Sequence, residues 1–180
     1  MPFFKGPGNP AVVRAVLGGW QLAGLAIIDS GTPLTVTNGG AFRLDPVTKL
    51  NIGGDYNADN TGGDRPNAPT VSLQSSGWSK QQFLAGIMPA SAFPTPLPGQ
   101  DGNLGRSTYP GPGFAQTDLS LAKAFSFTER LKATLRADAF NAFNRVNLNN
   151  PVMDLSSANF GKSTGTNTPR LIQLGLRIAF

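Results

Sequence analysis

The sequence contains no cysteine and no histidine. These absences exclude disulfide bonds, thiolate nucleophiles, metal sites built from thiolates or imidazoles, and every catalytic triad that uses histidine. Charged residues make up only 14% of the chain, and its net charge of +5 arises from lysines and arginines that are spread along it. Because the chain has neither a basic run nor an interleaved aromatic platform, we expect no binding to nucleic acid.

Long apolar runs are also missing, since no window approaches the roughly eighteen consecutive apolar residues of a spanning helix. Any membrane-spanning segment would therefore have to be a strand. The first ten residues, Met1 to Pro10, lack the apolar central region and the small-residue cleavage site of a signal peptide. If the protein resides in an outer membrane, we therefore expect this chain to be part of a longer exported protein.

Turn-forming residues are abundant, with 22 glycines and 15 prolines among 180 residues. This composition favours a loop-rich β protein, and the length suffices for one domain with a core. Four segments of the chain are predicted to be strands from their apolar and polar alternation or their β-branched content. They span about residues 19–37, 114–127, 131–143 and 170–180. The first is expected to be one long strand with a bend at Gly31–Pro33.

The last predicted strand has two distinct faces. One face carries an amide, a cation and small residues, among them Gln173 and Arg177. The other face is bulky and apolar, and it ends at an aromatic carboxyl terminus: Ile172, Leu174, Leu176, Ile178 and Phe180. Such a strand suits a boundary between an apolar and an aqueous medium, either between two sheets of a soluble sandwich or between lipid and a polar lumen.

The two middle strands are separated only by Thr128–Arg130, which predicts an antiparallel hairpin. Their alternation also separates an apolar face from a polar one. Lys123 interrupts the apolar face, and we expect this position only near an interface where the ammonium group reaches water. The apolar face includes Leu119, Leu121, Leu131 and Leu135, and the polar face includes Lys132, Arg136 and Asp138.

The connections alternate between long and short, because the loops 38–113 and 144–169 flank the three-residue turn. The two sides of an outer-membrane barrel differ in this way, with long extracellular loops and short periplasmic turns. We therefore predict an all-β antiparallel meander of about four long strands, forming the C-terminal segment of a large transmembrane β-barrel. The four leucines would face lipid, whereas Lys132, Arg136, Asp138, Gln173 and Arg177 would face the lumen. A soluble all-β binding or adhesion module remains the alternative.

The long loop raises two further hypotheses. Asp55, Asn57, Asp59 and Asp64 have the alternating oxygen ligands of a calcium loop, but Asn60 and Pro66 replace its glycine and glutamate, so ordinary turns are the better interpretation. A β-rich hydrolase would need two converging carboxylates, and nothing in the sequence sets the separation of Asp45, Asp55, Asp59, Asp64 and Asp101. We therefore expect no enzyme, no cofactor and no metal.

Two tryptophans and one short segment complete the candidates. Trp20 and Trp78 could stack on sugars, but an interfacial anchor and a loop-packing residue, respectively, are the favoured interpretations. Within the long loop, residues 79–86 are predicted to form a short helix.

Several motifs, in order along nearly the whole chain, resemble the C-terminal part of Oar-like TonB-dependent receptor barrels. They are Leu17–Gly24, Ser30–Thr35, Asp64–Asn67, Gly105–Arg106, Gly111–Phe114, Asp118–Leu121, Arg136–Asn144, Asn159–Gly161 and Arg170–Phe180. The resemblance implies an outer-membrane transporter or receptor whose full form has a plug and a barrel of about twenty-two strands. This chain corresponds to the last four.

The same resemblance implies the location and the partners. It places the chain in the outer membrane, in contact with lipid, the rest of the barrel and the plug, and it implies that TonB is reached only through N-terminal parts of the full protein. The alternating face that ends at Phe180 resembles the C-terminal signal that the barrel-assembly machinery reads, and strand addition to a sheet edge is the expected mode of reading.

Overall fold

The structure is a computed structural model that describes residues 16–40, 46–47 and 53–180. The segment Met1 to Pro10, which lacks the pattern of a signal peptide, and the candidate carboxylate Asp45 lie outside the described residues. The sequence predicted one barrel segment with two long loops, and in the structure the chain divides into two compact units. We call them the sheet unit, described at residues 16–28, 115–146 and 168–180, and the loop unit, described at 29–40, 46–47, 53–114 and 147–167.

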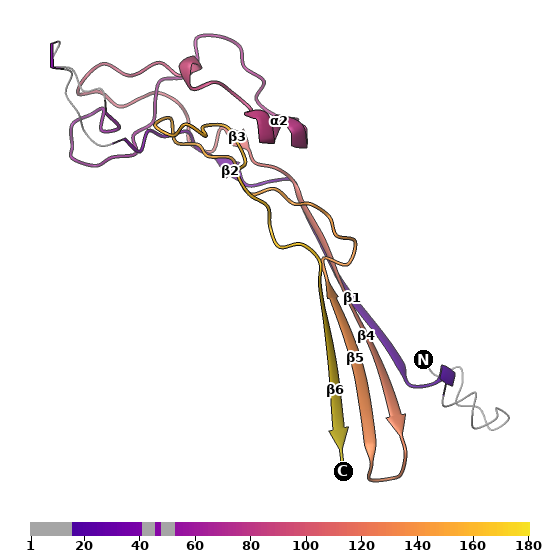
Figure 1. Ribbon diagram of the computed structural model, residues 1–180. Coiled ribbons are helices and arrows are strands. Elements are labelled where there is room, and N and C mark those ends of the chain that lie inside the picture. Colours follow the sequence, from indigo (N-terminus) through magenta and orange to yellow (C-terminus); the bar gives the residue numbers. More distant parts are fainter. Residues whose placement is uncertain (1–15, 41–45, 48–52) are drawn as a thin grey trace. The chain divides into compact units, whose positions relative to one another are not determined.

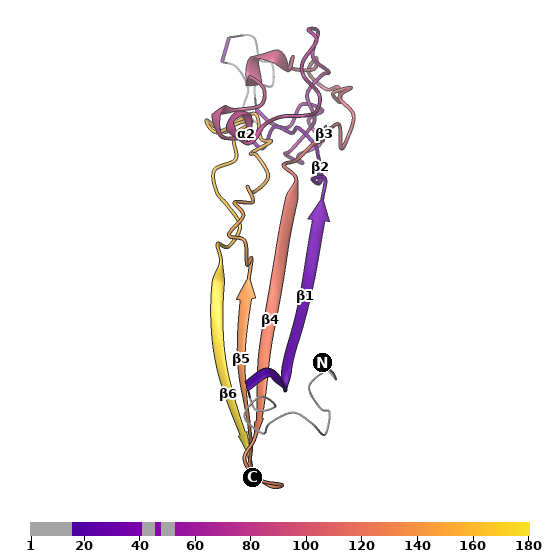
Figure 2. The same cartoon turned by 90° about the vertical axis from the view of Figure 1, so that its right-hand side faces the viewer.

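Four long strands form the sheet of the sheet unit (Figure 1). They are β1 (Trp20–Asp29), β4 (Phe114–Ser126), β5 (Lys132–Phe140) and β6 (Leu171–Ala179), and they lie side by side in the order β1-β4-β5-β6 (Figure 2). Among these four, each strand neighbours the next one along the chain. The structure therefore confirms the predicted antiparallel meander of four long strands.

The hairpin between β4 and β5 has the predicted tight turn. Ser126 pairs with Lys132, and the N–H groups of Phe127 and Thr128 both donate to the carbonyl of Leu131. At its other end β5 stops at Phe140, three residues earlier than expected. The next residue, Asn141, has a positive φ of 49°, and its side chain bonds the backbone of Arg145 in both directions, which turns the chain out of the sheet.

The prediction of one long strand over residues 19–37 is wrong, because β1 ends at Asp29. The carboxylate of Asp29 accepts a hydrogen bond from the N–H of Gly31, which has a φ of 106°. A side chain at position 31 would meet the carbonyl oxygen of Gly111 at 2.2 Å, so only glycine fits this turn. Beyond it, the short strand β2 (Pro33–Leu34) pairs with β3 (Tyr109–Pro110).

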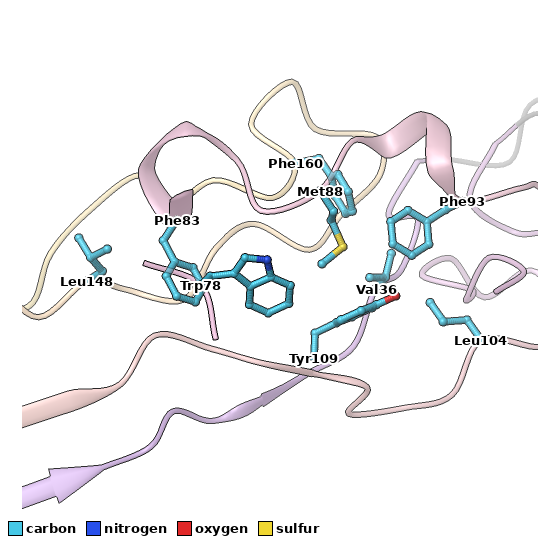
Figure 3. Packing of buried hydrophobic residues seen from close by; sticks show 9 residues of the cluster. All are labelled: Val36, Trp78, Phe83, Met88, Phe93, Leu104, Tyr109, Leu148 and Phe160. Atoms are coloured by element: carbon cyan, nitrogen blue, oxygen red, sulfur yellow. The ribbon is translucent and has the colours of Figure 1, made fainter. Parts of the chain in front are cut away.

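The loop unit contains a hydrophobic core, although it has little regular secondary structure (Figure 3). Aromatic rings dominate the core, with centroids 5.8 Å apart for Trp78 and Phe83 and 5.7 Å apart for Phe93 and Phe160. Burial in this core raises the pKa of the Tyr109 phenol. The buried residues of the cluster are Val36, Trp78, Phe83, Met88, Phe93, Leu104, Tyr109, Leu148 and Phe160.

The short helix predicted near residues 79–86 is present as α2 (Lys80–Ala85). Ser79 and Gln82 form a capping box, in which each side chain accepts a hydrogen bond from the other residue's backbone N–H. The single buried side chain of α2, Phe83, anchors the helix in the core. A one-turn 3₁₀ helix, η2 (Ala90–Ala92), follows. No helix in the described part of the chain is long and apolar enough to cross a membrane.

Candidate functional site

The pairing register determines which side chains share a face of the sheet. Ser120 lies opposite Asp138, which in turn lies opposite Gln173, and Thr134 lies opposite Arg177. Directly paired residues project on the same side, and so do alternate residues along each strand. The five residues predicted to face a lumen therefore share one face: Lys132, Arg136, Asp138, Gln173 and Arg177.

The charged groups of this polar face interact along the strand. Arg136 and Asp138 form an ion pair, with Nε and Oδ1 2.8 Å apart, and the carboxylate of Asp138 also accepts a hydrogen bond from Ser120. Across the strands, Asp138 lies opposite Gln173 on β6. Arg136 lies opposite Gly175, which has no side chain to offer, and its ion-pair partner is on its own strand.

A second carboxylate supports the end of the polar face. Asp118 of β4 accepts hydrogen bonds from the side-chain amide of Gln116 at 2.9 Å and from the backbone N–H of Asn141 at 2.8 Å. Asp118 therefore ties the end of β5 to β4. Together with Ser120, Arg136 and Asp138 it lines a shallow depression of about 320 Å³ on the sheet.

The opposite face of the sheet is apolar and uncovered. Leu135 pairs with Leu176, and Ala137 pairs with Leu174, whose side chain is 72% exposed. Among the described residues, no second layer of the sheet unit packs against these side chains. Of the leucines predicted to meet lipid, Leu119, Leu121 and Leu135 lie on this face, whereas Leu131 precedes β5 and lies in the hairpin turn.

Lys123 differs from its prediction. We expected its ammonium group to reach water, but the residue is only 4% exposed. Its Nζ donates to the carbonyl oxygens of Val16 and Gly18 and lies 5.1 Å from the centroid of the Trp20 ring. Backbone carbonyls before β1, rather than water, accept the hydrogen bonds of the ammonium group. No sequence pattern around Lys123 predicts this contact.

The residues predicted as the assembly signal lie on the last strand. Ile172, Leu174, Leu176 and Ile178 lie on the apolar face of β6, and Phe180 follows the end of the strand with a fully exposed ring. In the four-stranded sheet β6 is an outer strand that pairs only with β5. Its free edge therefore presents unpaired backbone groups to a further strand.

The four residues of the candidate calcium loop do come together in the loop unit. The carboxylate of Asp64 accepts from the N–H groups of Tyr56 and Asn57, at 2.7 and 3.2 Å. The carboxylate of Asp55 likewise accepts from the N–H groups of Asp59 and Asn60. These carboxylates hold the backbone turns, and the described residues contain no cluster of three or more acidic side chains arranged to hold a metal ion.

The two tryptophans have different surroundings. Trp78 lies in the core of the loop unit, which confirms its interpretation as a loop-packing residue. Trp20 is 40% exposed, and its indole N–H donates to the carbonyl of Val16 at 2.9 Å. Trp20 therefore belongs to the same contact as Lys123, at the start of β1.

A family model described as an outer membrane beta barrel domain matches residues 1–173. No curated protein and no solved structure matches the chain. The match covers nearly the whole chain, and it decides between the two protein classes that the alternation of the strands left open. The chain belongs to the outer membrane beta barrel domain family, and its antiparallel strands form part of a barrel located in the outer membrane.

Proposed function

We propose that the sheet unit is part of the wall of an Oar-like TonB-dependent receptor barrel. In the intact protein this barrel takes part in the uptake or surface binding of a ligand. The observation that supports the proposal most directly is the register of β4, β5 and β6, which gathers the charged side chains on one face and the bulky apolar ones on the other. A barrel wall between lipid and a polar lumen needs this separation.

The polar face would line the lumen and contact the plug or the passing ligand. Arg136 is 60% exposed at its side chain although it pairs with Asp138, so its remaining N–H groups are open to a partner. Gly175 opposite it leaves space on the neighbouring strand. This part of the wall therefore suits polar or anionic groups of a plug or ligand.

The partners follow from the two faces and the free edge. The apolar face contacts outer-membrane lipid, the outer strands pair with the rest of the barrel, and the residues from Ile172 to Phe180 are read by the barrel-assembly machinery. TonB engages other parts of the intact protein. In this proposal the chain has no catalytic step and needs no cofactor.

Substitution at two neighbouring positions of β5 tests the assignment of the faces. Leu135→Arg places a charge on the apolar face, where an arginine near the bilayer midplane costs about 2–4 kcal/mol. Thr134→Arg places the same charge on the polar face one residue away. We expect Leu135→Arg to lower the yield of membrane-inserted full-length protein strongly and Thr134→Arg to leave it nearly unchanged, as measured by folding into lipid vesicles.

The same pair also shows how the proposal fails. If Thr134→Arg reduces insertion as much as Leu135→Arg does, the polar face does not line a water-filled lumen. A ligand-uptake assay in cells, with Arg136→Gln as the variant, then tests the transport role separately from insertion. Normal insertion with unchanged uptake would reject a role for Arg136 in the passage.

The assembly role of the C-terminal residue has its own test. We expect Phe180→Ala to slow insertion by the assembly machinery in cells and to leave spontaneous refolding in detergent unchanged, because the Phe180 ring makes no packing contact that buries it. Leu121→Ala, on the apolar face of β4 and outside the C-terminal signal, is the comparison and should insert at the unmodified rate. Equal insertion rates for Phe180→Ala and the unmodified chain would contradict this role.

A further inference from the structure

The loop unit contains a polar hollow of about 350 Å³ that the sequence analysis did not identify. A hollow of this volume lies in the range of small-molecule sites. Two arginines, two aspartates and two threonines line it together with two glycines: Arg65, Arg106, Asp64, Asp101, Thr35 and Thr37. All of them belong to the loop unit.

One wall of the hollow is held by two segments that bond each other. The N–H of Leu104 donates to the carbonyl of Pro66 at 3.1 Å, and the guanidinium of Arg65 donates to the carbonyl of Leu104. At Gly102 a side chain would meet the carbonyl oxygen of Arg65 at 1.9 Å, so the two backbones lie in direct contact. The side-chain oxygen of Asn103 also accepts a hydrogen bond from the N–H of Ala68, at 2.7 Å.

Another part of the lining is anchored by the core. Leu34 and Val36 are buried, and Val36 is fully inaccessible to solvent. The residues between and after them, Thr35 and Thr37, line the hollow. The hydroxyl of Thr35 accepts from the N–H of Ser107 at 2.8 Å, which fixes that side chain beside the segment that carries Arg106. Both parts of the lining are therefore preformed, which lowers the entropy cost of binding.

The charges of the hollow are not paired with one another. Neither arginine and neither aspartate forms an ion pair with any residue that the structure describes. Arg106 also makes no hydrogen bond to the described part of the chain, and one carboxylate oxygen of Asp101 accepts only from the side chain of Asn57, at 2.9 Å. Asp64 and Arg65 are also hydrogen-bonded to the backbone, but no charge of the hollow is neutralised by a described residue of opposite sign. Charged groups of both signs in one small hollow suit a ligand that carries both signs.

We propose that this hollow binds a small zwitterionic ligand, namely a short peptide with a free amino and a free carboxyl terminus. The guanidinium of Arg106, supported by that of Arg65, receives the carboxylate, and the carboxylates of Asp101 and Asp64 receive the ammonium group. A simple anion would face two aspartates, and a simple cation would face two arginines. Among the described residues that line the hollow none is aromatic, so they offer a sugar no ring to stack on.

This inference rests on the proposed surface-binding role, because it names the class of ligand. The two are tested independently. Membrane insertion of Leu135→Arg and Thr134→Arg reports on the barrel alone, whereas ligand binding by the purified chain reports on the hollow alone. A normal insertion pattern without peptide binding rejects the hollow and leaves the barrel assignment intact.

The experiment is isothermal titration calorimetry of the full chain in mild detergent with trialanine as the probe. We expect trialanine to bind, and we expect the form with an acetylated amino terminus and an amidated carboxyl terminus to bind at least about tenfold more weakly, because each charged hydrogen bond is lost. No heat of binding for trialanine, or equal affinity for the blocked form, would overturn the proposal.

Two variants assign the two ends of the peptide. Arg106→Gln is expected to weaken the binding of trialanine about tenfold or more. It should leave the affinity for trialanine amide unchanged, since that probe has no carboxylate. Asp101→Asn is expected to weaken trialanine and to leave acetyl-trialanine unchanged. Arg130→Gln and Glu129→Gln, in the exposed hairpin turn, are the matched controls and should bind as the unmodified chain does.

Hydrogen exchange shows whether a variant loses affinity because it has lost a ligand contact or because the loop unit is less stable. Protection of the loop-unit core should be the same in Arg106→Gln and in the unmodified chain, because Arg106 is exposed and makes no bond to the described residues. Loss of peptide affinity with unchanged protection supports direct contact with the ligand. An equal loss of affinity in the two turn variants would contradict it.

Discussion

The two units of this protein treat their apolar residues in opposite ways. In the sheet unit, large apolar side chains recur with a period of two and lie exposed, as in β6, where every residue of the strand is exposed. In the loop unit, the apolar residues follow no regular period, yet nine of them are buried in one cluster. Regular secondary structure and a buried core are therefore separate properties in this chain.

The difference has a physical explanation. A strand backbone satisfies its hydrogen bonds through its neighbours, so an exposed apolar face is tolerated if lipid covers it. A chain with few strands and helices lacks that framework, and the loop unit is held instead by aromatic packing and by side-chain to backbone bonds such as those of Asp64 and Asp55. The sheet unit therefore depends on its surroundings, whereas the loop unit is stabilised from within.

The largest expected effect comes from opening the core of the loop unit. Phe93→Ala removes a buried ring that contacts Tyr109 and Phe160, and we expect a loss of about 3–5 kcal/mol in the free energy of unfolding of this unit. Hydrogen-exchange mass spectrometry of residues 79–93, in detergent, measures it. Leu97→Ala, at a position that is 68% exposed, should change little; an equal effect of both variants would contradict a core.

The next effect concerns the single buried cation of the described sheet unit. Lys123→Met keeps the apolar stem but leaves the carbonyls of Val16 and Gly18 without this donor, at a cost of about 1–3 kcal/mol. We expect faster exchange at the start of β1 and a shift in the fluorescence of Trp20. Lys132→Met, which removes an exposed lysine from the same hairpin, is the control. Unchanged exchange in Lys123→Met would show that the contact does not hold the segment before β1.

A smaller effect, of opposite sign, is expected inside the loop unit. The hydroxyl of Ser163 is buried and has no hydrogen-bond partner among the described residues. Ser163→Ala should therefore be neutral or stabilise the unit by up to about 1 kcal/mol, because it removes an unsatisfied polar group. Chemical denaturation monitored by the fluorescence of Trp78 measures this change. A clear destabilisation would mean that the hydroxyl is hydrogen-bonded in solution.

The smallest expected effect is a pH dependence of the loop unit. Partial burial acts to raise the pKa of Asp154, but hydrogen bonds from the N–H of Gly39 and from the N–H and hydroxyl of Ser156 outweigh it, so the pKa lies below its ordinary value. The resulting stabilisation is present above the unfolded-state pKa of about 3.9 and is lost as the pH falls through the folded-state value. Asp154→Asn should reduce the fall in the free energy of unfolding of the loop unit as the pH is lowered below about 5. An unchanged dependence of that free energy on pH would contradict this prediction.

The sheet was predictable because its determinants are local. The alternation of residues 170–180 predicts a strand with two distinct faces, and the three-residue turn after Phe127 predicts an antiparallel hairpin. Each of these signals lies within a few residues of sequence. The register follows from the turn, and it places Arg136 and Asp138 on the predicted face. The strand bounds were less exact at Asp29 and Phe140, where positive φ values at Gly31 and Asn141 turn the chain.

The polar hollow and the contact of Lys123 were not predictable in this way. Arg65 and Arg106 lie 41 positions apart in the sequence, and no periodic pattern connects them. Their segments meet only because Gly102 allows two backbones to touch and because the core brings residues 34–37 beside them. Lys123 likewise meets carbonyls more than one hundred positions away.

The amino-acid sequence by itself determined the antiparallel sheet and its two faces, because a two-residue period and short turns act over a few residues. Tertiary structure alone decided that the described residues of the loop unit form a unit with its own core, and that charges from distant segments line one hollow. The physical reason is that the contacts of an irregular backbone are not predicted by any pattern in the neighbouring sequence. Its contacts arise only when buried aromatic rings and close backbone approaches bring remote segments together.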